Sequence, residues 1–142
     1  MNILKNMADL RFKPIEHPSD VGIIAYGKNL KEIFENAAYG MFSLMADLDK
    51  VEPKQSLKIK VEAEDQESLL VNWLNELIFN EDAKKMIFKD FKITKLTDRE
   101  LEAEVRGEKI NLDVHDLYRP VKAATYNQLE IRENCAKIIF DV

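Results

Sequence analysis

The sequence predicts a single α+β domain, in which antiparallel or mixed β-sheet packs against two amphipathic helices. Two helical ladders of apolar residues and several segments of alternating apolar and charged residues lead to this fold class. No repeat or Gly/Ser linker separates them. The 142 residues, 46% hydrophobic and 33% charged, suit one compact domain over residues 1–142.

The helices are predicted over residues 30–45 and 66–80. In each segment apolar residues recur every three or four positions, which gives a helix one buried face. Asn29 and Asp65 directly precede the two ladders and are suited to cap the helix N-termini. The large side chains that we expect in the core are Phe34, Phe42, Trp73 and Leu77.

The remaining segments alternate with period two, which indicates strands. Charged residues on the outward positions predict sheets that face water on one side, and hence antiparallel or mixed pairing. The last segment is predicted to form a hairpin that turns near Glu133 and Asn134. The element order is then roughly ββαβαβββββ, with strands at 12–15, 23–26, 57–63, 91–96, 100–106 and within 129–142.

Composition excludes several classes of site. Cys135 is the only cysteine, so there is no internal disulfide or Cys-rich zinc site, and a bound metal would be held by oxygen. The formal charge of −5 disfavours direct binding to nucleic-acid phosphates, so any RNA would be held by a partner. No signal peptide or membrane-spanning run is present, which predicts a cytoplasmic protein that does not bind membranes.

Two segments hold candidate metal-binding groups. The turn HPSDVG brings together the imidazole of His17 and the carboxylate of Asp20, although turn chemistry alone explains such residues. At the other end of the sequence, Asp141 adjoins the α-carboxylate of Val142. If that strand end lies near Asp20, the grouped carboxylates would repel unless a hard cation such as calcium, magnesium or manganese binds them. The alternative is a chain end that simply frays.

Other candidates favour structural roles. His115 stands between Asp113 and Asp116, an arrangement that a loop explains better than a metal site. The acidic residues of ADLDKVEPK match no known cation loop and are interpreted as solvated charges. No nucleophile motif is present, so we expect no stand-alone catalysis.

Five ordered segments together resemble the archease family. The resemblance runs from about Phe12 to Val142 and implies a compact α+β fold. It also implies an accessory protein of the RtcB-type RNA-splicing ligase in tRNA splicing, which promotes the ligase's guanylylation with GTP and its multiple turnover without performing ligation. The segments are HPSDVG, ENAAYGMFSLMADLDKVEP, VNWLNELIF, HDLYRPVKAATYN and IIFDV.

The resemblance also assigns residues. It places metal binding on Asp20, Asp141 and Val142 and a functional lysine at Lys122, while His17 is expected to orient Asp20. The expected cofactor is a divalent cation, with calcium the ion to be observed and manganese or magnesium the alternatives in function. Lys122 has three possible roles: a contact to a phosphate or a ligase carboxylate, a salt bridge to the acidic cluster, or that of an exposed strand lysine.

The chain departs from the family pattern at three positions. Pro18 and Ser19 stand where the family usually reads His-Thr-Ala-Asp, and Asn127 stands where a histidine commonly follows TY. None of these departures removes the carboxylate of Asp20. They leave a threonine hydroxyl and a second imidazole without counterparts.

The resemblance implies the RtcB-type ligase as partner, with tRNA bound only indirectly. Net acidity suits docking on a basic RNA-binding enzyme. One alternative is a general chaperone or assembly factor for RNA-processing enzymes, using the Met-rich first helix as an apolar surface. Another is a small metal-dependent hydrolase. The sequence leaves the oligomeric state open.

Overall fold

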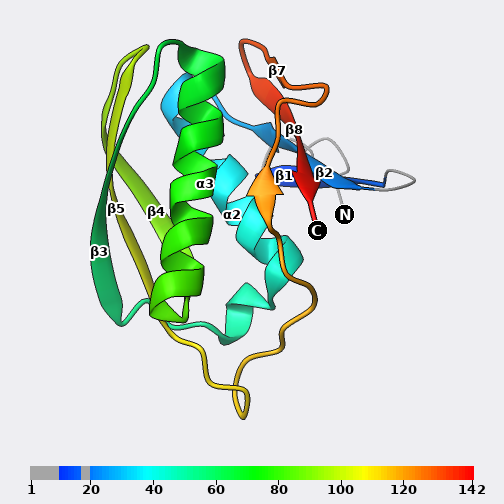
Figure 1. Cartoon of the computed structure of the whole chain (residues 1–142), viewed down its shortest axis with the longest axis vertical. Helices are drawn as coiled ribbons and strands as arrows, with labels where there is room; N and C mark the ends of the chain where they lie inside the picture. Colours follow the sequence, from blue (N-terminus) through cyan, green and yellow to red (C-terminus); the bar gives the residue numbers. More distant parts are fainter. Residues whose placement is uncertain (1–9, 17–19) are drawn as a thin grey trace.

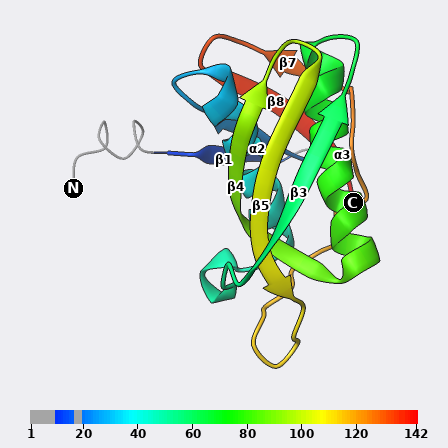
Figure 2. The same ribbon diagram turned by 90° about the vertical axis from the view of Figure 1, so that its left-hand side faces the viewer.

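The computed structural model describes residues 10–16 and 20–142, and there it has two α-helices lying between two antiparallel sheets (Figures 1 and 2). This confirms the predicted α+β class. The elements are β1 (Phe12–Glu16), β2 (Val21–Tyr26), α2 (Leu30–Met45), the 3-10 turn η1 (Leu48–Lys50), β3 (Gln55–Glu62), α3 (Gln66–Lys84), β4 (Met86–Leu96), β5 (Glu100–Lys109), β6 (Ala123–Ala124), β7 (Glu130–Ile131) and β8 (Cys135–Asp141).

The strands divide into two sheets. The five-stranded sheet has the order β1-β2-β8-β6, with β7 also pairing with β8, and the three-stranded sheet has the order β3-β5-β4. Every strand pair in them is antiparallel. In Figure 1, α2 and α3 fill the space between the sheets, so that each helix is covered by strands. The last strand along the sequence, β8, is therefore an inner strand of the larger sheet.

Helix α2 has the predicted bounds. The Asn29 carboxamide oxygen accepts a hydrogen bond from the backbone N–H of Glu32 at 2.9 Å, which satisfies one of the free donors at the helix N-terminus. The helix contacts β2 on one side and β4 on the other. Its methionines Met41 and Met45 are 0% and 4% exposed, so they fill the core and offer no apolar surface.

Helix α3 starts as predicted but ends at Lys84 rather than Asn80. Asp65 caps it by accepting from the N–H of Ser68 at 2.8 Å. The polar side chain of Asn80 does not end the helix, because its amide donates to the Glu76 carbonyl one turn earlier, at 2.8 Å. Termination comes at Lys85, whose φ of 54° is left-handed and whose N–H bonds back to the Glu81 carbonyl.

The predicted strands are present, but β4 begins at Met86 and not at residue 91. A register shift between Phe88 and Asp90 breaks the alternation there, so the first part of β4 does not show period two in the sequence. Beside this irregularity β5 passes very close to β4, since a Cβ at Gly107 would overlap the carbonyl of Ile87. Only glycine fits at that position.

The core contains the side chains predicted for it. Phe34, Phe42, Trp73 and Leu77 are all 0% exposed. The indole N–H of Trp73 donates to the Phe34 carbonyl at 3.0 Å, which links α3 to α2 and satisfies the one polar atom of the ring. In the described residues no helix is long and apolar enough to span a membrane.

Candidate acidic site at the ends of β2 and β8

The structure brings the two predicted aspartates to neighbouring strand ends. Strand β2 pairs with β8, and the first pair of this ladder is Val21 with Phe140. Continuing the register by one residue places Asp20 opposite Asp141, although they are more than 100 positions apart in sequence. Directly opposite residues have Cβ atoms about 4.5 to 5.5 Å apart, within reach of a shared cation.

Close packing of the two strands fixes this arrangement. A Cβ at Gly22 would lie 2.7 Å from the Ile139 side chain and 2.8 Å from the Ile138 carbonyl, so β2 can lie against β8 only because residue 22 has no side chain. Phe140 is 0% exposed and Asp141 is exposed, so β8 emerges from the core at its last residues. The glycine of HPSDVG thus supports the position of Asp20.

Lys122 lies at the same end of the sheet. Its backbone N–H donates to the Asp141 carbonyl at 2.8 Å, just before β6 pairs with β8 through Ala123 and Asp141. The side chain is exposed and makes no ion pair within 4.0 Å in the part of the chain that the structure describes. The structure therefore shows no intramolecular salt bridge from Lys122 to the acidic pair, which leaves a partner contact or a solvated lysine.

Strand β6 is held in place by Asn75 of α3, a residue to which the sequence analysis gave no role. The Asn75 side-chain oxygen accepts from the N–H of Ala124 at 2.8 Å, and its amide nitrogen donates to the carbonyl of the same residue at 3.3 Å. The other edge of β6 pairs with β8. The stretch VNWLNELIF carries three polar residues, Asn72, Asn75 and Glu76, and nothing in it marks Asn75 as the anchor.

The donor chemistry of this site fits a hard cation. Two carboxylates on adjacent strands supply only oxygen, which calcium, magnesium and manganese prefer. Over residues 10–16 and 20–142 no group of three His, Cys, Asp or Glu side chains is placed to hold a metal. The sequence offers the Val142 carboxylate as a third ligand. His17, with Pro18 and Ser19, lies outside the described residues.

His115 is a structural residue, as interpreted from the sequence, but its partner is neither Asp113 nor Asp116. Its Nδ1 accepts from the N–H of Asn111 at 3.0 Å, so Nε2 carries the proton and donates to the Glu108 carboxylate at 2.9 Å. The N–H of Glu52, and then His115, lower the pKa of Glu108 below its usual value. This network ties the loop after β5 to the body of the protein.

The other acidic segment also has a structural role. Asp47 caps η1 by accepting from the N–H of Asp49 at 3.1 Å, and Asp49 itself is exposed. Asn127, where the family often has histidine, is exposed and its N–H bonds to the Thr125 hydroxyl at 3.3 Å. The same hydroxyl donates to the Ile139 carbonyl at 2.9 Å, so this turn is attached to β8 without an imidazole.

Comparison with known proteins gives consistent results. Residues 12–142 match a sequence model of the Archease protein family (MTH1598/TM1083). The chain is 40% identical to "Protein archease" of Sulfurisphaera tokodaii over 125 residues, which covers 85% of this chain and 88% of that one. It is 32% identical to "Protein archease" of Methanosarcina mazei over 140 residues, with 93% and 96% covered.

Two solved structures are similar to this fold. The solution structure of Methanobacterium thermoautotrophicum protein 1598 superposes with a TM-score of 0.77 at 33% identity, covering 93% of this chain and 99% of that one. The crystal structure of a Thermotoga maritima archease, titled a possible chaperone, gives 0.58 at 21% identity, with 92% and 96% covered. The second likeness supports the fold alone.

Proposed function

The chain belongs to the archease family, and on that premise we propose that it is a non-enzymatic accessory protein of an RtcB-type RNA-splicing ligase in tRNA splicing. It promotes GTP-dependent guanylylation and multiple turnover of the ligase. The observation that carries the proposal is the register of β2 and β8, which places Asp20 opposite Asp141 at an exposed strand end. Two carboxylates brought this close repel each other, and a bound cation or a basic partner would offset that repulsion.

In the proposed mechanism, Asp20, Asp141 and the Val142 carboxylate hold a divalent cation. A divalent cation held by these residues would supply positive charge near the GTP phosphates in the ligase active site. Packing of β8 between β2 and β6 holds the backbone of Asp141 in the sheet, so little ordering of this residue is needed when the partner binds. Lys122, held by the Asp141 carbonyl, is placed to contact a phosphate or a ligase carboxylate.

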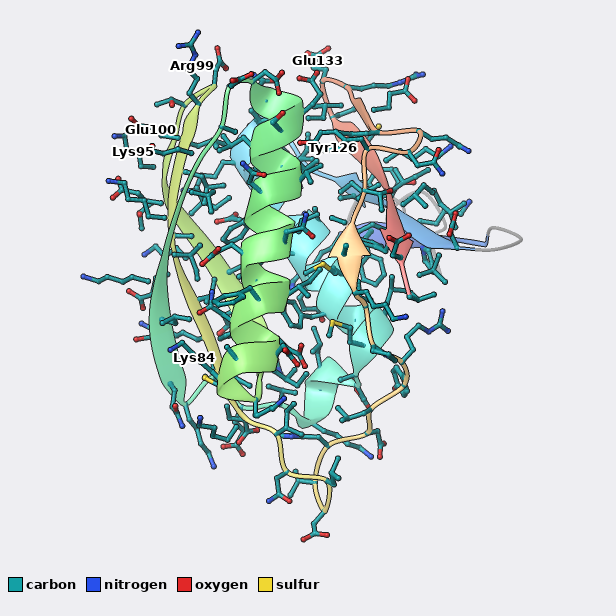
Figure 3. All side chains as sticks on the ribbon, viewed as in Figure 1. Lys84, Lys95, Arg99, Glu100, Tyr126 and Glu133 are labelled. Carbon is teal, nitrogen blue, oxygen red and sulfur yellow. The ribbon has the colours of Figure 1, made fainter. Side chains whose placement is uncertain are left out.

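The test measures ligase guanylylation with and without this protein. Asp20→Ala and Asp141→Ala should each abolish stimulation and weaken calcium binding in a calorimetric titration. Glu133→Ala is the matched control, because it removes the same charge from the turn before β8, at the other end of the strand (Figure 3). It should stimulate like wild type.

A glycine added after Val142 examines the third ligand. The extension moves the terminal carboxylate by roughly 3.5 Å and leaves every side chain in place. Full stimulation by this variant would exclude the Val142 carboxylate as a ligand. Full stimulation by both aspartate variants would refute the metal mechanism and favour the chaperone alternative. Ligation by this protein alone would contradict the accessory role.

A further inference from the structure

The loop between β5 and β6 exposes an unusual number of apolar side chains. It projects beyond one end of both sheets, as both views show (Figures 1 and 2). Four of the eight large hydrophobic residues exposed in the described part of the chain lie in this loop, within seven consecutive positions, so they are concentrated on one segment rather than scattered along the sequence. We call this the apolar loop: Leu112 (76% exposed), Val114 (52%), Leu117 (44%) and Tyr118 (59%).

The backbone of the apolar loop is firmly attached to the protein. The His115 side chain is 1% exposed and bonds to Glu108 and to the Asn111 N–H. The Tyr118 N–H donates to the Met45 carbonyl at 2.8 Å, and the Asp47 N–H donates to the Asp116 carbonyl at 3.0 Å. Because the backbone is ordered before binding, the exposed apolar side chains would lose little conformational freedom against a partner.

A pocket adjoins the loop. It has a volume of about 270 Å³ and lies between the ends of α2 and α3 and the loop. Glu81 of α3 lies in it, half-buried and without an ion pair within 4.0 Å among the described residues; burial, and then the nearby Asp82, raise the pKa of this carboxyl. The other lining residues are Met45, Ile87, Leu117, Tyr118, Arg119 and Pro120.

This combination defines the chemistry of a ligand. Apart from Glu81 and the exposed Arg119, the lining is apolar and suits the aliphatic stem of a lysine or arginine, and the half-buried Glu81 carboxylate, which has no ion pair among the described residues, suits its charged end. Leu117 and Tyr118, which are exposed and line the pocket, suit apolar neighbours of that basic residue. A protein segment that carries one basic side chain among apolar ones therefore matches both parts of the surface.

We propose that the apolar loop and the Glu81 pocket form a second docking surface for the ligase, which receives a segment with a lysine or arginine among apolar side chains. The inference rests on the proposed function and adds to it a site for affinity that is separate from the acidic site. Continuity along the chain supports this occupant, because only Arg119, Pro120 and Val121 separate the loop from Lys122, whose N–H donates to the Asp141 carbonyl. One partner can thus cover both surfaces.

A second copy of this chain fits less well. A stable dimer needs about 20 to 30 residues from each partner, far more than the loop supplies. A symmetric contact would also bring the exposed, negatively charged Asp113 near the same residue of the other copy.

The experiment separates affinity from maximal effect. Full-length wild type, the double variant Leu112→Ser/Val114→Ser, and Glu81→Gln are each titrated against an RtcB-type ligase by calorimetry, and guanylylation is measured up to saturation. We expect the double variant to raise Kd at least about tenfold, and Glu81→Gln several-fold, with stimulation at saturation unchanged. Asp141→Ala should show the reverse, with little change in Kd and no stimulation.

Phe79→Ser is the matched control, because Phe79 is also exposed (64%) but lies on α3 outside the loop and the pocket lining. It should bind like wild type. If wild type stimulates the ligase and the double variant binds with unchanged Kd, the docking surface is refuted while the proposed function stands. An equal loss in Phe79→Ser, or wild-type dimers that the double variant abolishes in sedimentation, would also refute it. If wild type neither binds nor stimulates, the proposed function fails, and this inference with it.

Discussion

Replacing Asn75 with alanine is expected to lower the free energy of unfolding by about 2 kcal/mol. The variant loses the bond from the Ala124 N–H at 2.8 Å and the weaker one to the Ala124 carbonyl at 3.3 Å. Ala124 is only 5% exposed, so water cannot fully replace them. An unsatisfied buried donor costs about 1 to 3 kcal/mol, and the long second bond adds little.

Asn72→Ala is the matched control. Asn72 lies on the same helix and also donates to a backbone carbonyl, that of Glu62, at 2.9 Å, but it is exposed and water can take over. Both variants replace asparagine by alanine in the same helix, so the change in helix propensity is equal. The difference between their free energies of unfolding therefore reports the burial of the lost hydrogen bonds.

The assay is thermal unfolding followed by circular dichroism. At roughly 3 to 4 °C per kcal/mol for a domain of this size, Asn75→Ala should melt about 6 to 8 °C below wild type, and Asn72→Ala near it. Amide exchange at Ala124 should also accelerate. If the two variants melt within about 1 °C of each other, the reasoning about buried edge groups is refuted.

Three further predictions concern stability. Trp73→Ala should cost about 3 to 5 kcal/mol in urea denaturation, because the indole is 0% exposed; a loss under about 1 kcal/mol would contradict its place in the core. Lys85→Gly should stabilise by roughly 0.5 kcal/mol, since relief of the left-handed φ outweighs the entropy of glycine; destabilisation would show that Lys85 contributes more through its side chain. The pKa of Glu108 is lowered in the fold, so its charged form stabilises the protein above its usual value of 4.5 and this contribution is lost as pH falls through the lowered pKa. The stability advantage of wild type over Glu108→Gln should therefore be greatest near neutral pH and shrink in acid, and a pH-independent difference would contradict that origin.

The helix starts were predictable because their causes are local. Asn29 and Asp65 cap α2 and α3 through residues three positions away, which sequence spacing reveals. The end of α3 was not predictable for two reasons. The Asn80 side-chain amide donates to the Glu76 carbonyl within the helix, so this polar residue does not end it. The left-handed backbone conformation that ends the helix is adopted by Lys85, whereas a sequence pattern would point to a glycine. The start of β4 was hidden by an irregular register, a property of the pairing with β5 rather than of either strand.

For the candidate site, charge and spacing suggested a grouping that only long-range pairing could produce. Alternation placed Asp141 at the end of a strand, but nothing local pairs that strand with the one after Asp20. Before the structure, only the resemblance to the archease family assigned Asp20 and Asp141 to one site. The Glu108 partner of His115 and the Asn75 anchor depend on contacts between elements, and the sequence alone gave no sign of either.

The inner position of β8 bears on how the protein folds as it is synthesised. Strands β1 and β2 are synthesised early, but β2 pairs with its second neighbour, β8, only after β8 has been synthesised. Strands β6 and β7 also pair with β8, so they join the sheet only at that stage. Such high sequence separation slows folding, because a long loop must close before the contacts form. The acidic pair therefore forms only after β8 has been synthesised.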